Sequence, residues 1–388
     1  MTAVAGRLRL LHVITRLVLG GAQENTLLTL AHLDRDLFDI TLASGPTQGP
    51  EGSLEADVPP DVRFVRIPDL VRDPSPVRDL RALRVLYRLM RDGRFDVVHT
   101  HTTKAGLLGR VAARLAGVPV VIHTPHGHAF HGYLSPLASG ALVALERVLA
   151  RWTDRIVCLT EAEREDYLSR GVGDPTRLAV VHSGVALERF TGPPRALSPL
   201  REALGIPEGC PVVGCVARLV PVKGVDVLLE AFAGVRSVVP HARLVVVGDG
   251  PDRAALEAQA RTLHLDGCVT FAGLRRDVPD LMRLFDVVAV PSRNEGMGKV
   301  AVEAMAAGRP VVASAVSGLR DVVRDGQTGL LVPPGDPRAL AAALTRLLAD
   351  PALRARMGEA GRIRAADYAV ARMVEALTSL YRNLAVAG

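Results

Sequence analysis

The sequence is poor in aromatic residues, and it lacks other features that mark large protein classes. Phe, Trp and Tyr make up 4% of the 388 residues, which leaves few side chains for the base stacking used by single-stranded nucleic-acid binders. No apolar run approaches the roughly 20 residues of a membrane-spanning helix. The net charge of +6 is small, and both halves of the chain share it. We therefore predict a protein that neither binds nucleic acid nor spans a bilayer.

Cysteine is also scarce, and its spacing argues against a disulfide framework. The four cysteines form no Cys-x-x-Cys pair, and Cys158, Cys215 and Cys268 lie in or beside apolar runs. Small buried residues in a reducing compartment fit this pattern. The apolar stretch from Arg7 to Arg16 has no cleavage-site pattern after it, so it is interpreted as a first buried strand and not as a signal peptide. We expect a cytoplasmic protein.

Short β-branched runs alternate with helix-length amphipathic stretches, which predicts parallel sheets built from βα units. The expected strands are residues 8–15, 39–43, 62–67, 96–100, 118–123, 155–159, 178–181, 212–217, 244–248, 269–271, 287–291 and 311–313. A Pro- and Gly-rich passage, residues 192–211, separates two such series. We predict an α/β protein of two doubly wound, Rossmann-like domains facing across a cleft, residues 1–195 and 196–366. A terminal helix, 367–388, packs back towards the first domain.

The strongest motif runs from Asn294 to Ala313, where a strand end, a glycine-bearing loop and a helix follow one another. The helix N-terminus offers backbone N–H groups at the sheet edge where ligands bind in open α/β folds. Glu295 lies in the loop, and Glu303 lies about two turns further on, so they can serve different parts of one extended ligand. A carboxylate that accepts hydrogen bonds from a diol can hold a ribose. The alternative is an exposed capping Glu and an unrelated helical Glu.

A second motif places Arg218 after a predicted strand and Lys223 at the following helix start. Cations at a helix start oppose the helix dipole, and a bound phosphate resolves that conflict. Arg grips a diphosphate through two nitrogens, and Lys acts as a point charge. Only three of the 47 basic residues are lysines, so a lysine here is informative, although a solvated surface cation stays possible. The turn that contains Gly248 is a weaker signal of the same kind.

In the first domain, Gly20 and Gly21 follow the first strand and open a helix, which is a turn compatible with phosphate. The full G-x-G-x-x-G is missing, and no acidic residue ends the second strand, so a dinucleotide-binding fold is disfavoured. A simple tight turn is the alternative. Lys104 also begins a helix, where it either meets an anionic acceptor or is a surface lysine. The Asp34–Asp36 pair resembles a metal-binding D-x-D, but it precedes a strand, so we predict a solvated turn.

Histidine is concentrated in one window of the first domain, which raises the question of a metal site. Six of the eleven histidines fall there: His99, His101, His123, His126, His128 and His131. Imidazoles are metal ligands, but a zinc site needs supporting groups such as carboxylates, and residues 97–145 contain no Asp or Glu. We therefore predict no metal site.

These motifs resemble the family 4 retaining glycosyltransferases, and the resemblance covers most of the chain. It implies a two-domain GT-B enzyme, without metal or other cofactor, that transfers a hexose-type sugar from a nucleotide diphosphate sugar. UDP is the commonest donor nucleotide in that family. The acceptor is unidentified, and a lipid-linked or polysaccharide-precursor glycan fits. The resemblance further implies a front-face displacement that keeps the anomeric configuration and is assisted by the leaving phosphate.

The resemblance also gives roles to individual residues. The R-x4-K-G pattern puts Arg218 and Lys223 on the donor diphosphate, and the E-x7-E pattern puts Glu295 at the transferred sugar and Glu303 at the ribose. Further positions near the sugar or phosphates are Gly20, Gly21, Gly296, Met297, Gly298 and Lys299. His126, with His128 as the fallback, corresponds to a histidine that contacts the donor sugar at its reacting face. Asp321 stands where the family usually has Glu, a departure expected to change little.

Three other classes of protein stay open: a sugar-nucleotide epimerase of the same two-domain plan, a non-catalytic sugar-nucleotide-binding module, and an NAD-dependent oxidoreductase.

The segment from Val77 to Arg94 raises the question of contact with a membrane. One helical face carries five arginines, namely Arg78, Arg81, Arg84, Arg88 and Arg91. Apolar residues occupy the opposite face. The arginine face is either solvated or in peripheral contact with anionic lipid headgroups.

Overall fold

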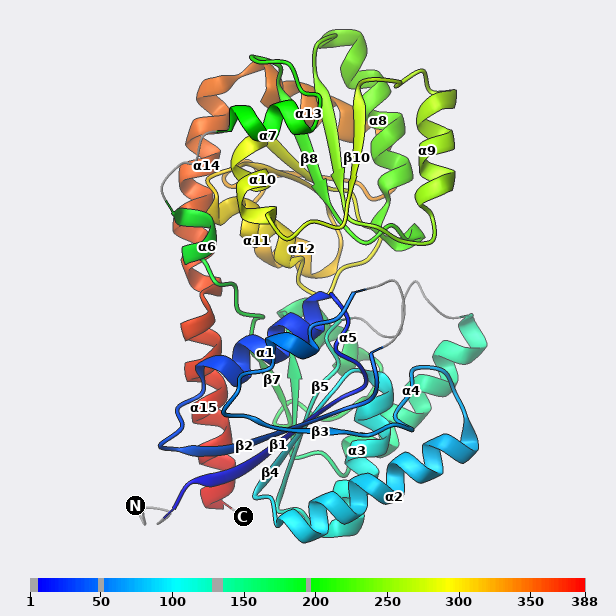
Figure 1. Cartoon of the computed structure of the whole chain (residues 1–388), viewed down its shortest axis with the longest axis vertical. Helices are drawn as coiled ribbons and strands as arrows, with labels where there is room; N and C mark the ends of the chain where they lie inside the picture. The colour runs from blue at the N-terminus through cyan, green and yellow to red at the C-terminus, as the bar shows by residue number, and fades with distance from the viewer. Residues whose placement is uncertain (1–5, 48–51, 128–134, 193–196, 388) are drawn as a thin grey trace. The chain divides into compact units, whose positions relative to one another are not determined.

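A computed structural model describes residues 6–47, 52–127, 135–192 and 197–387 (Figure 1). It contains two compact units, one formed by Met1–Gly184 and Val370–Gly388 and the other by Val185–Ala369. Each unit is a parallel sheet with helices on both faces, as the alternating sequence pattern predicted. No helix among the described residues is long and apolar enough to cross a membrane.

The described part of the first unit has a seven-stranded sheet in the order β3-β2-β1-β4-β5-β6-β7. Its strands are β1 (Leu8–Ile14), β2 (Phe38–Ser44), β3 (Arg63–Arg66), β4 (Val97–His101), β5 (Val120–Thr124), β6 (Arg155–Cys158) and β7 (Leu178–Val180). Its helices are α1 (Gly21–His32), η1 (Glu55–Asp57), α2 (Pro76–Gly93), α3 (Thr103–Ala116), α4 (Pro136–Ala150), α5 (Glu161–Ser169) and α15 (Val370–Ala387).

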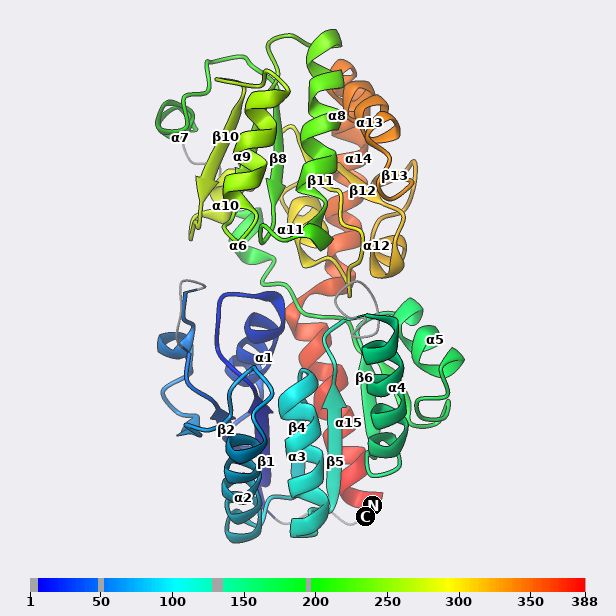
Figure 2. The same ribbon diagram turned by 90° about the vertical axis from the view of Figure 1, so that its right-hand side faces the viewer.

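Both faces of this sheet are buried, so apolar and polar residues of its central strands alike lie in the core. Alternate residues of β1 point to opposite faces. Leu10 and Ile14 pack in the core that includes α1 and α15, whereas Leu11 and Val13 pack in the core that includes α2 and α3. Figure 2 shows α3 in front of this sheet and α15 behind it. The histidines of β1 and β4 lie on the α15 face, and this position determines their surroundings.

The described part of the second unit has a six-stranded sheet in the order β10-β9-β8-β11-β12-β13. Its strands are β8 (Val212–Val216), β9 (Arg243–Val247), β10 (Val269–Gly273), β11 (Val287–Val290), β12 (Val311–Ser314) and β13 (Gly329–Val332). Its helices are α6 (Glu188–Thr191), α7 (Ser198–Ala203), η2 (Pro221–Lys223), α8 (Val225–Val238), α9 (Arg253–Thr262), α10 (Val278–Leu284), α11 (Lys299–Ala306), α12 (Ser317–Val322), α13 (Pro337–Ala349), α14 (Pro351–Ala365) and η3 (Ala366–Tyr368). The edge strand β13 was not among the strands expected from the sequence.

The units divide at Gly184 and Ala369, whereas the sequence placed the domain boundaries at 195 and 366. Residues after Gly184 belong to the second unit because Phe190 of α6 is buried there, and Arg283 Nη2 donates a hydrogen bond to the Arg189 carbonyl at 3.0 Å. The terminal helix α15 belongs to the first unit, where its apolar residues join the core beside α1.

Candidate functional site

In the second unit, the loop that carries Lys223 is packed against the loop that follows β11. Gly224, directly after η2, has a φ of 65°, and a Cβ at this position would lie 2.1 Å from the carbonyl oxygen of Pro291. A side chain would therefore force the two loops apart. This close approach puts Lys223, from the β8 side, beside the residues at the carboxyl end of β11.

Glu295 lies in that second loop and forms an ion pair with Lys223. Glu295 Oε1 meets Lys223 Nζ and also accepts a hydrogen bond from Ser292 Oγ at 2.9 Å. The side chains of Lys223 and Glu295 are 24% and 13% exposed, so water screens the pair less than it would at an open surface. The geometry brings together two residues that the sequence had assigned to one ligand.

Arg293, which the sequence analysis did not single out, fastens the same two loops together. Its guanidinium donates to both carboxylate oxygens of Asp226, at 2.8 and 2.6 Å, and to the Pro221 carbonyl at 2.6 Å. Its backbone N–H donates to the Val222 carbonyl at 2.7 Å. Burial raises the pKa of Asp226, but the hydrogen bonds and positive charge of Arg293, together with backbone hydrogen bonds, outweigh this effect and hold that pKa below its ordinary value. In the sequence, the one signal that could have identified Arg293 is its position directly before the motif that begins at Asn294.

The glycine-bearing loop leads into α11 and is buttressed by a second close backbone contact. A Cβ on Gly318 would lie 1.9 Å from the Gly296 carbonyl oxygen, so α12 can approach this loop only with glycine there. Met297 is buried, and Gly298 precedes Lys299, the first residue of α11. Glu303 lies in α11 and is half-buried. The loop therefore has a defined shape at the N-terminus of α11.

Arg218 and Gly248 lie in the loops after the two neighbouring strands β8 and β9. Arg218 is exposed, and the next residue, Leu219, donates its N–H to the Asp249 carbonyl at 2.9 Å. The two loops are therefore in contact. Since β9, β8 and β11 are adjacent in the sheet, the predicted donor-site residues of this unit gather at the carboxyl ends of three neighbouring strands. This is the edge where open α/β sheets bind ligands.

In the first unit, His126 follows β5 and is fixed from two directions. Its φ is 64°, an uncommon conformation for a residue other than glycine. Its Nε2 lies 2.9 Å from His101 Nδ1, and the N–H of the next residue, Gly127, donates to Glu163 Oε1 at 3.0 Å. Glu163 is fully buried, and its backbone N–H is capped by Thr160 Oγ1 at 3.2 Å. The pattern Thr-x-x-Glu predicts a helix start, but it gives no sign of the contact with Gly127.

Gly20 and Gly21 lie between β1 and α1 in the first unit. The Gly20 carbonyl accepts the Glu24 N–H at 3.0 Å, and Gly21 is exposed. The φ of Gly20 is 175°, an extended conformation that any residue can adopt. Backbone strain therefore does not explain this glycine.

Buried histidines form a group that the sequence analysis considered only in part. One ring nitrogen each of His12, His99 and His101 lies within 4.8 Å of the others, and all three side chains are buried. Their nitrogens make short hydrogen bonds, for example 2.7 Å from His99 Nδ1 to Tyr381 Oη. The group contains no carboxylate to offset a divalent charge in the core, where an uncompensated charge is costly. His128 and His131 lie outside the described residues.

Two other predicted features have ordinary partners. Lys104 forms an ion pair with Asp79 of α2 at 2.6 Å, so it links α3 to α2. Asp34 and Asp36 are exposed in the turn between α1 and β2, where Asp34 Oδ1 accepts the Asp36 N–H at 2.8 Å.

Comparison with known proteins identifies the family. Residues 198–364 match the family model "Glycosyl transferases group 1", and residues 20–184 match "Glycosyl transferase 4-like domain". Over 390 residues, the chain is 30% identical to the UDP-Gal:alpha-D-GlcNAc-diphosphoundecaprenol alpha-1,3-galactosyltransferase of Escherichia coli, and the match covers all of both chains. The protein belongs to the GT-B glycosyltransferases. Its α/β units and the loops at their sheet edges are thus those of a sugar-transferring enzyme.

Further relatives of this glycosyltransferase differ in what they act on. It is 38% identical over 310 residues to the D-inositol 3-phosphate glycosyltransferase of Salinispora arenicola, a match that covers 74% of this chain and 69% of that one. Among solved structures, sucrose-phosphate synthase from Thermosynechococcus elongatus superposes with a TM-score of 0.84 at 26% identity, over 98% of this chain and 100% of that one. HepE of Anabaena with UDP-glucose gives 0.83 at 25% identity, over 97% and 100%.

Proposed function

We propose that this glycosyltransferase moves a hexose-type sugar from UDP to a lipid-linked glycan precursor with retention of configuration. The observation that carries the proposal is the meeting of Lys223 and Glu295 at the sheet edge of the second unit, with Glu303 on the adjoining helix. HepE, with UDP-glucose, supports a UDP-sugar donor. The Escherichia coli relative, whose name specifies a diphosphoundecaprenol-linked acceptor, supports the acceptor class.

In the proposed reaction, the second unit binds the donor and stabilises its leaving group. Arg218 and Lys223 offset the charge that develops on the diphosphate, so fixed cations do what a metal ion does elsewhere. The acceptor oxygen bonds to the anomeric carbon on the face from which the diphosphate departs. The bond from that carbon to the diphosphate oxygen breaks, and the acceptor proton passes to the leaving phosphate. Glu295 and His126 contact the transferred sugar, and Glu303 holds the ribose.

The names of several relatives support a second candidate acceptor, inositol phosphate. Relatives named D-inositol 3-phosphate glycosyltransferase are 37–40% identical to this chain over about 290–320 residues. Inositol phosphate is therefore the alternative acceptor. It differs from a lipid-linked glycan in being water-soluble, so the two acceptors separate cleanly by extraction.

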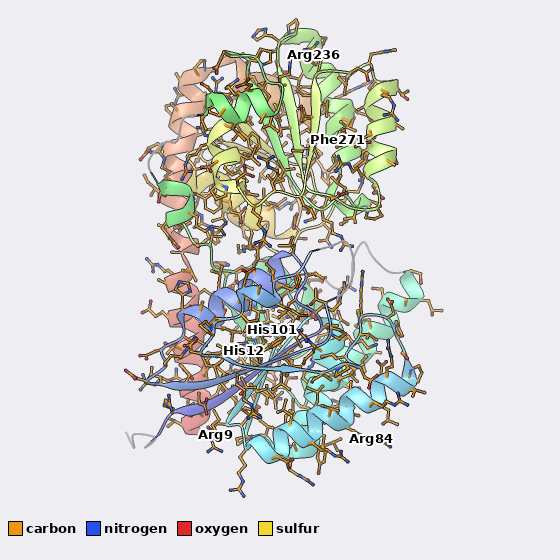
Figure 3. All side chains as sticks on the ribbon, viewed as in Figure 1. Arg9, His12, Arg84, His101, Arg236 and Phe271 are labelled. Carbon is orange, nitrogen blue, oxygen red and sulfur yellow. The ribbon has the colours of Figure 1, made fainter. Side chains whose placement is uncertain are left out.

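Helix α2 supports contact of the enzyme with an anionic membrane surface. Its arginines are exposed, and Val77, Leu80 and Val85 beside them are 63%, 47% and 42% exposed. Arg84 lies on the outer side of the helix (Figure 3). Exposed arginines attract anionic headgroups, and exposed apolar side chains beside them can enter the lipid interface. Exchange of Arg84 and Arg88 for glutamate is expected to abolish co-sedimentation with anionic vesicles, and unchanged co-sedimentation would contradict the proposal.

Sugar transfer is tested directly with labelled UDP-galactose and UDP-glucose and two acceptors, GlcNAc-diphosphoundecaprenol and D-inositol 3-phosphate. We expect label in the organic phase with the lipid acceptor and an α-linkage by proton NMR of the product. Label in inositol phosphate instead selects the alternative acceptor, and a β-linkage overturns retention. Conversion of the UDP-sugar to its epimer without any acceptor would identify an epimerase.

A further inference from the structure

Three histidines of the first unit form a hydrogen-bonded chain that ends at His126. His12 Nδ1 lies 2.8 Å from His101 Nε2, and His101 Nδ1 lies 2.9 Å from His126 Nε2. His12 and His101 are 0% and 3% exposed. Figure 3 shows them close together inside the unit. Since each contact uses a different ring nitrogen, the imidazoles are linked end to end.

The strand register places this chain on one face of the sheet. His12 of β1 is paired with His99 of β4, and His101 comes two residues later on the same side. Helix α15 covers that face, and its Tyr381 contacts His99. The chain therefore runs from the core, under α15, to the loop after β5.

Burial keeps the two inner histidines neutral. It is the largest cause that lowers the pKa of His12 to about 3, with a smaller contribution from the positive form of His126. It likewise lowers the pKa of His101, where the neighbours His99, His12, His126 and His123 add to the effect. On the other face of the sheet, burial is the largest cause that lowers the pKa of His123, and the positive charge of Arg110 adds to it. A neutral imidazole carries one N–H and one acceptor nitrogen, so both bonds must run in the same direction along the chain.

The inner end of the chain decides that direction. Among the described residues, no hydrogen-bond partner lies near His12 Nε2, which is fully buried. If the protons pointed inward, His12 would carry an N–H at this position, and buried N–H groups without an acceptor are rare in folded proteins. If they point outward, His12 Nδ1–H donates to His101, and His101 Nδ1–H donates to His126. At the inner end, the outward direction leaves an acceptor nitrogen on His12 unsatisfied, which proteins tolerate somewhat better than an unsatisfied N–H. It puts the last N–H of the chain on His126 Nδ1, in a half-buried residue of the loop after β5, where a ligand oxygen can accept it.

We infer that His101, oriented by His12, is a positioning residue that holds His126 in the tautomer with its proton on Nδ1. In this state His126 Nε2 is an acceptor for His101, and His126 presents a donor to an oxygen of its ligand. The identity of that ligand as the donor sugar rests on the proposed function. The tautomer of His126 does not rest on the proposed function, because contacts within the protein set it before any ligand binds.

The tautomer is measured by long-range ¹⁵N–¹H NMR on the whole protein labelled at histidine, without donor, and His126→Gln assigns the signals. We expect a protonated Nδ1 and an unprotonated Nε2 for His126. The His101→Leu variant removes the donor to Nε2, so His126 is expected to gain the Nε2–H form. In His101→Asn, an amide N–H near the former Nδ1 position restores the original tautomer. His123→Leu, a matched loss of a buried histidine outside the chain, leaves it unchanged.

Enzyme kinetics supply the second readout. His101→Leu is expected to lower kcat about threefold to tenfold, the range of one hydrogen bond, and His101→Asn to recover part of it. A protonated Nε2 in wild-type His126, or a His126 tautomer that His101→Leu does not change, would overturn the inference even if sugar transfer is observed. The expected tautomers without sugar transfer from any donor would leave the inference standing and contradict the proposed function instead.

Discussion

Lys223 and Glu295, 72 residues apart in the sequence, form an ion pair at the carboxyl edge of the second sheet. The pair exists because Gly224 lets the two loops meet and Arg293 fastens them. In the proposed function, the donor diphosphate meets Lys223 as a cation that the ion pair and the loop contact already fix. Such preorganisation is an effective way to stabilise charge in a transition state.

Glu295→Gln is expected to lower the rate of sugar transfer by roughly 10- to 100-fold, the range for loss of a hydrogen bond to a charged group. The amide can still accept the hydrogen bond from Ser292 Oγ, so the loop keeps its shape. Steady-state kinetics with the best donor measure the effect. The control, Ser292→Ala, removes that hydrogen bond but keeps the charge, and it should cost less than about fivefold. Equal losses in the two variants would mean that loop shape and not the carboxylate matters.

Gly318→Ala is expected to weaken donor binding and to lower the free energy of unfolding by roughly 1–3 kcal/mol, because the new methyl group overlaps the Gly296 carbonyl. Calorimetric titration and chemical denaturation measure the two effects. Gly140→Ala is the control, since a Cβ there meets no atom within 4 Å. A Gly318→Ala enzyme that binds donor as tightly as wild type would show that this loop does not form the donor site.

The buried ion pair of Arg110 with Glu146 makes a prediction about stability. Arg110 Nη2 lies 2.7 and 2.8 Å from the two carboxylate oxygens, and the side chains are 0% and 4% exposed. Arg110→Met leaves a buried carboxylate alone and should cost roughly 3–5 kcal/mol in chemical denaturation. The double variant with Glu146→Leu should cost less than either single one. Arg164→Met, which breaks an exposed pair with Glu161, should cost less than about 1 kcal/mol.

The buried histidines predict that the protein loses stability as the pH falls below about 6.5. The folded pKa of His12 is about 3, and the pKa values of His99, His101 and His123 are also well below their ordinary value because of burial. Below about pH 6.5 the unfolded chain binds more protons than the folded chain, so the free energy of unfolding decreases, by up to about 1.4 kcal/mol per pH unit for each histidine.

Denaturation at about pH 7, 6 and 5 tests this linkage. In His12→Leu, the slope of the free energy of unfolding against pH should be smaller by about one proton. A stability that is constant or rises towards low pH would mean that these histidines are protonated in the folded state.

The sequence predicted most of the fold because each buried strand is a short β-branched run between helix-length stretches. It missed β13, because Gly329–Val332 contains a single β-branched residue and lies between turn-forming segments. It placed residues 185–195 in the first domain because the Pro- and Gly-rich passage, residues 192–211, was interpreted as the linker. Their assignment to the second unit depends on the packing of Phe190, which no local pattern reveals.

The position of a residue at the sheet edge was predictable where it follows a strand closely, as for Arg218 and Glu295. Contacts were not predictable where partners come from separate segments. The contact of Arg293 with Asp226 spans 67 residues, and that of His12 with His101 spans 89. Both depend on which strands are neighbours and in which register. Glu163 is a further example. Its carboxylate accepts the Gly127 N–H beside His126, yet it lies outside residues 97–145, the segment that contains the cluster of histidines.

The most direct test of the donor site is calorimetric titration of UDP-, GDP- and ADP-sugars against wild type, Lys223→Ala and Glu303→Ala. Lys104→Ala and Glu359→Ala serve as matched controls, since these residues are paired with Asp79 and with Arg362. We expect a UDP-sugar to bind wild type and both controls, and Lys223→Ala and Glu303→Ala to weaken it at least about tenfold. Folded variants that bind as tightly as wild type, or a wild type that binds no sugar nucleotide, would contradict the account.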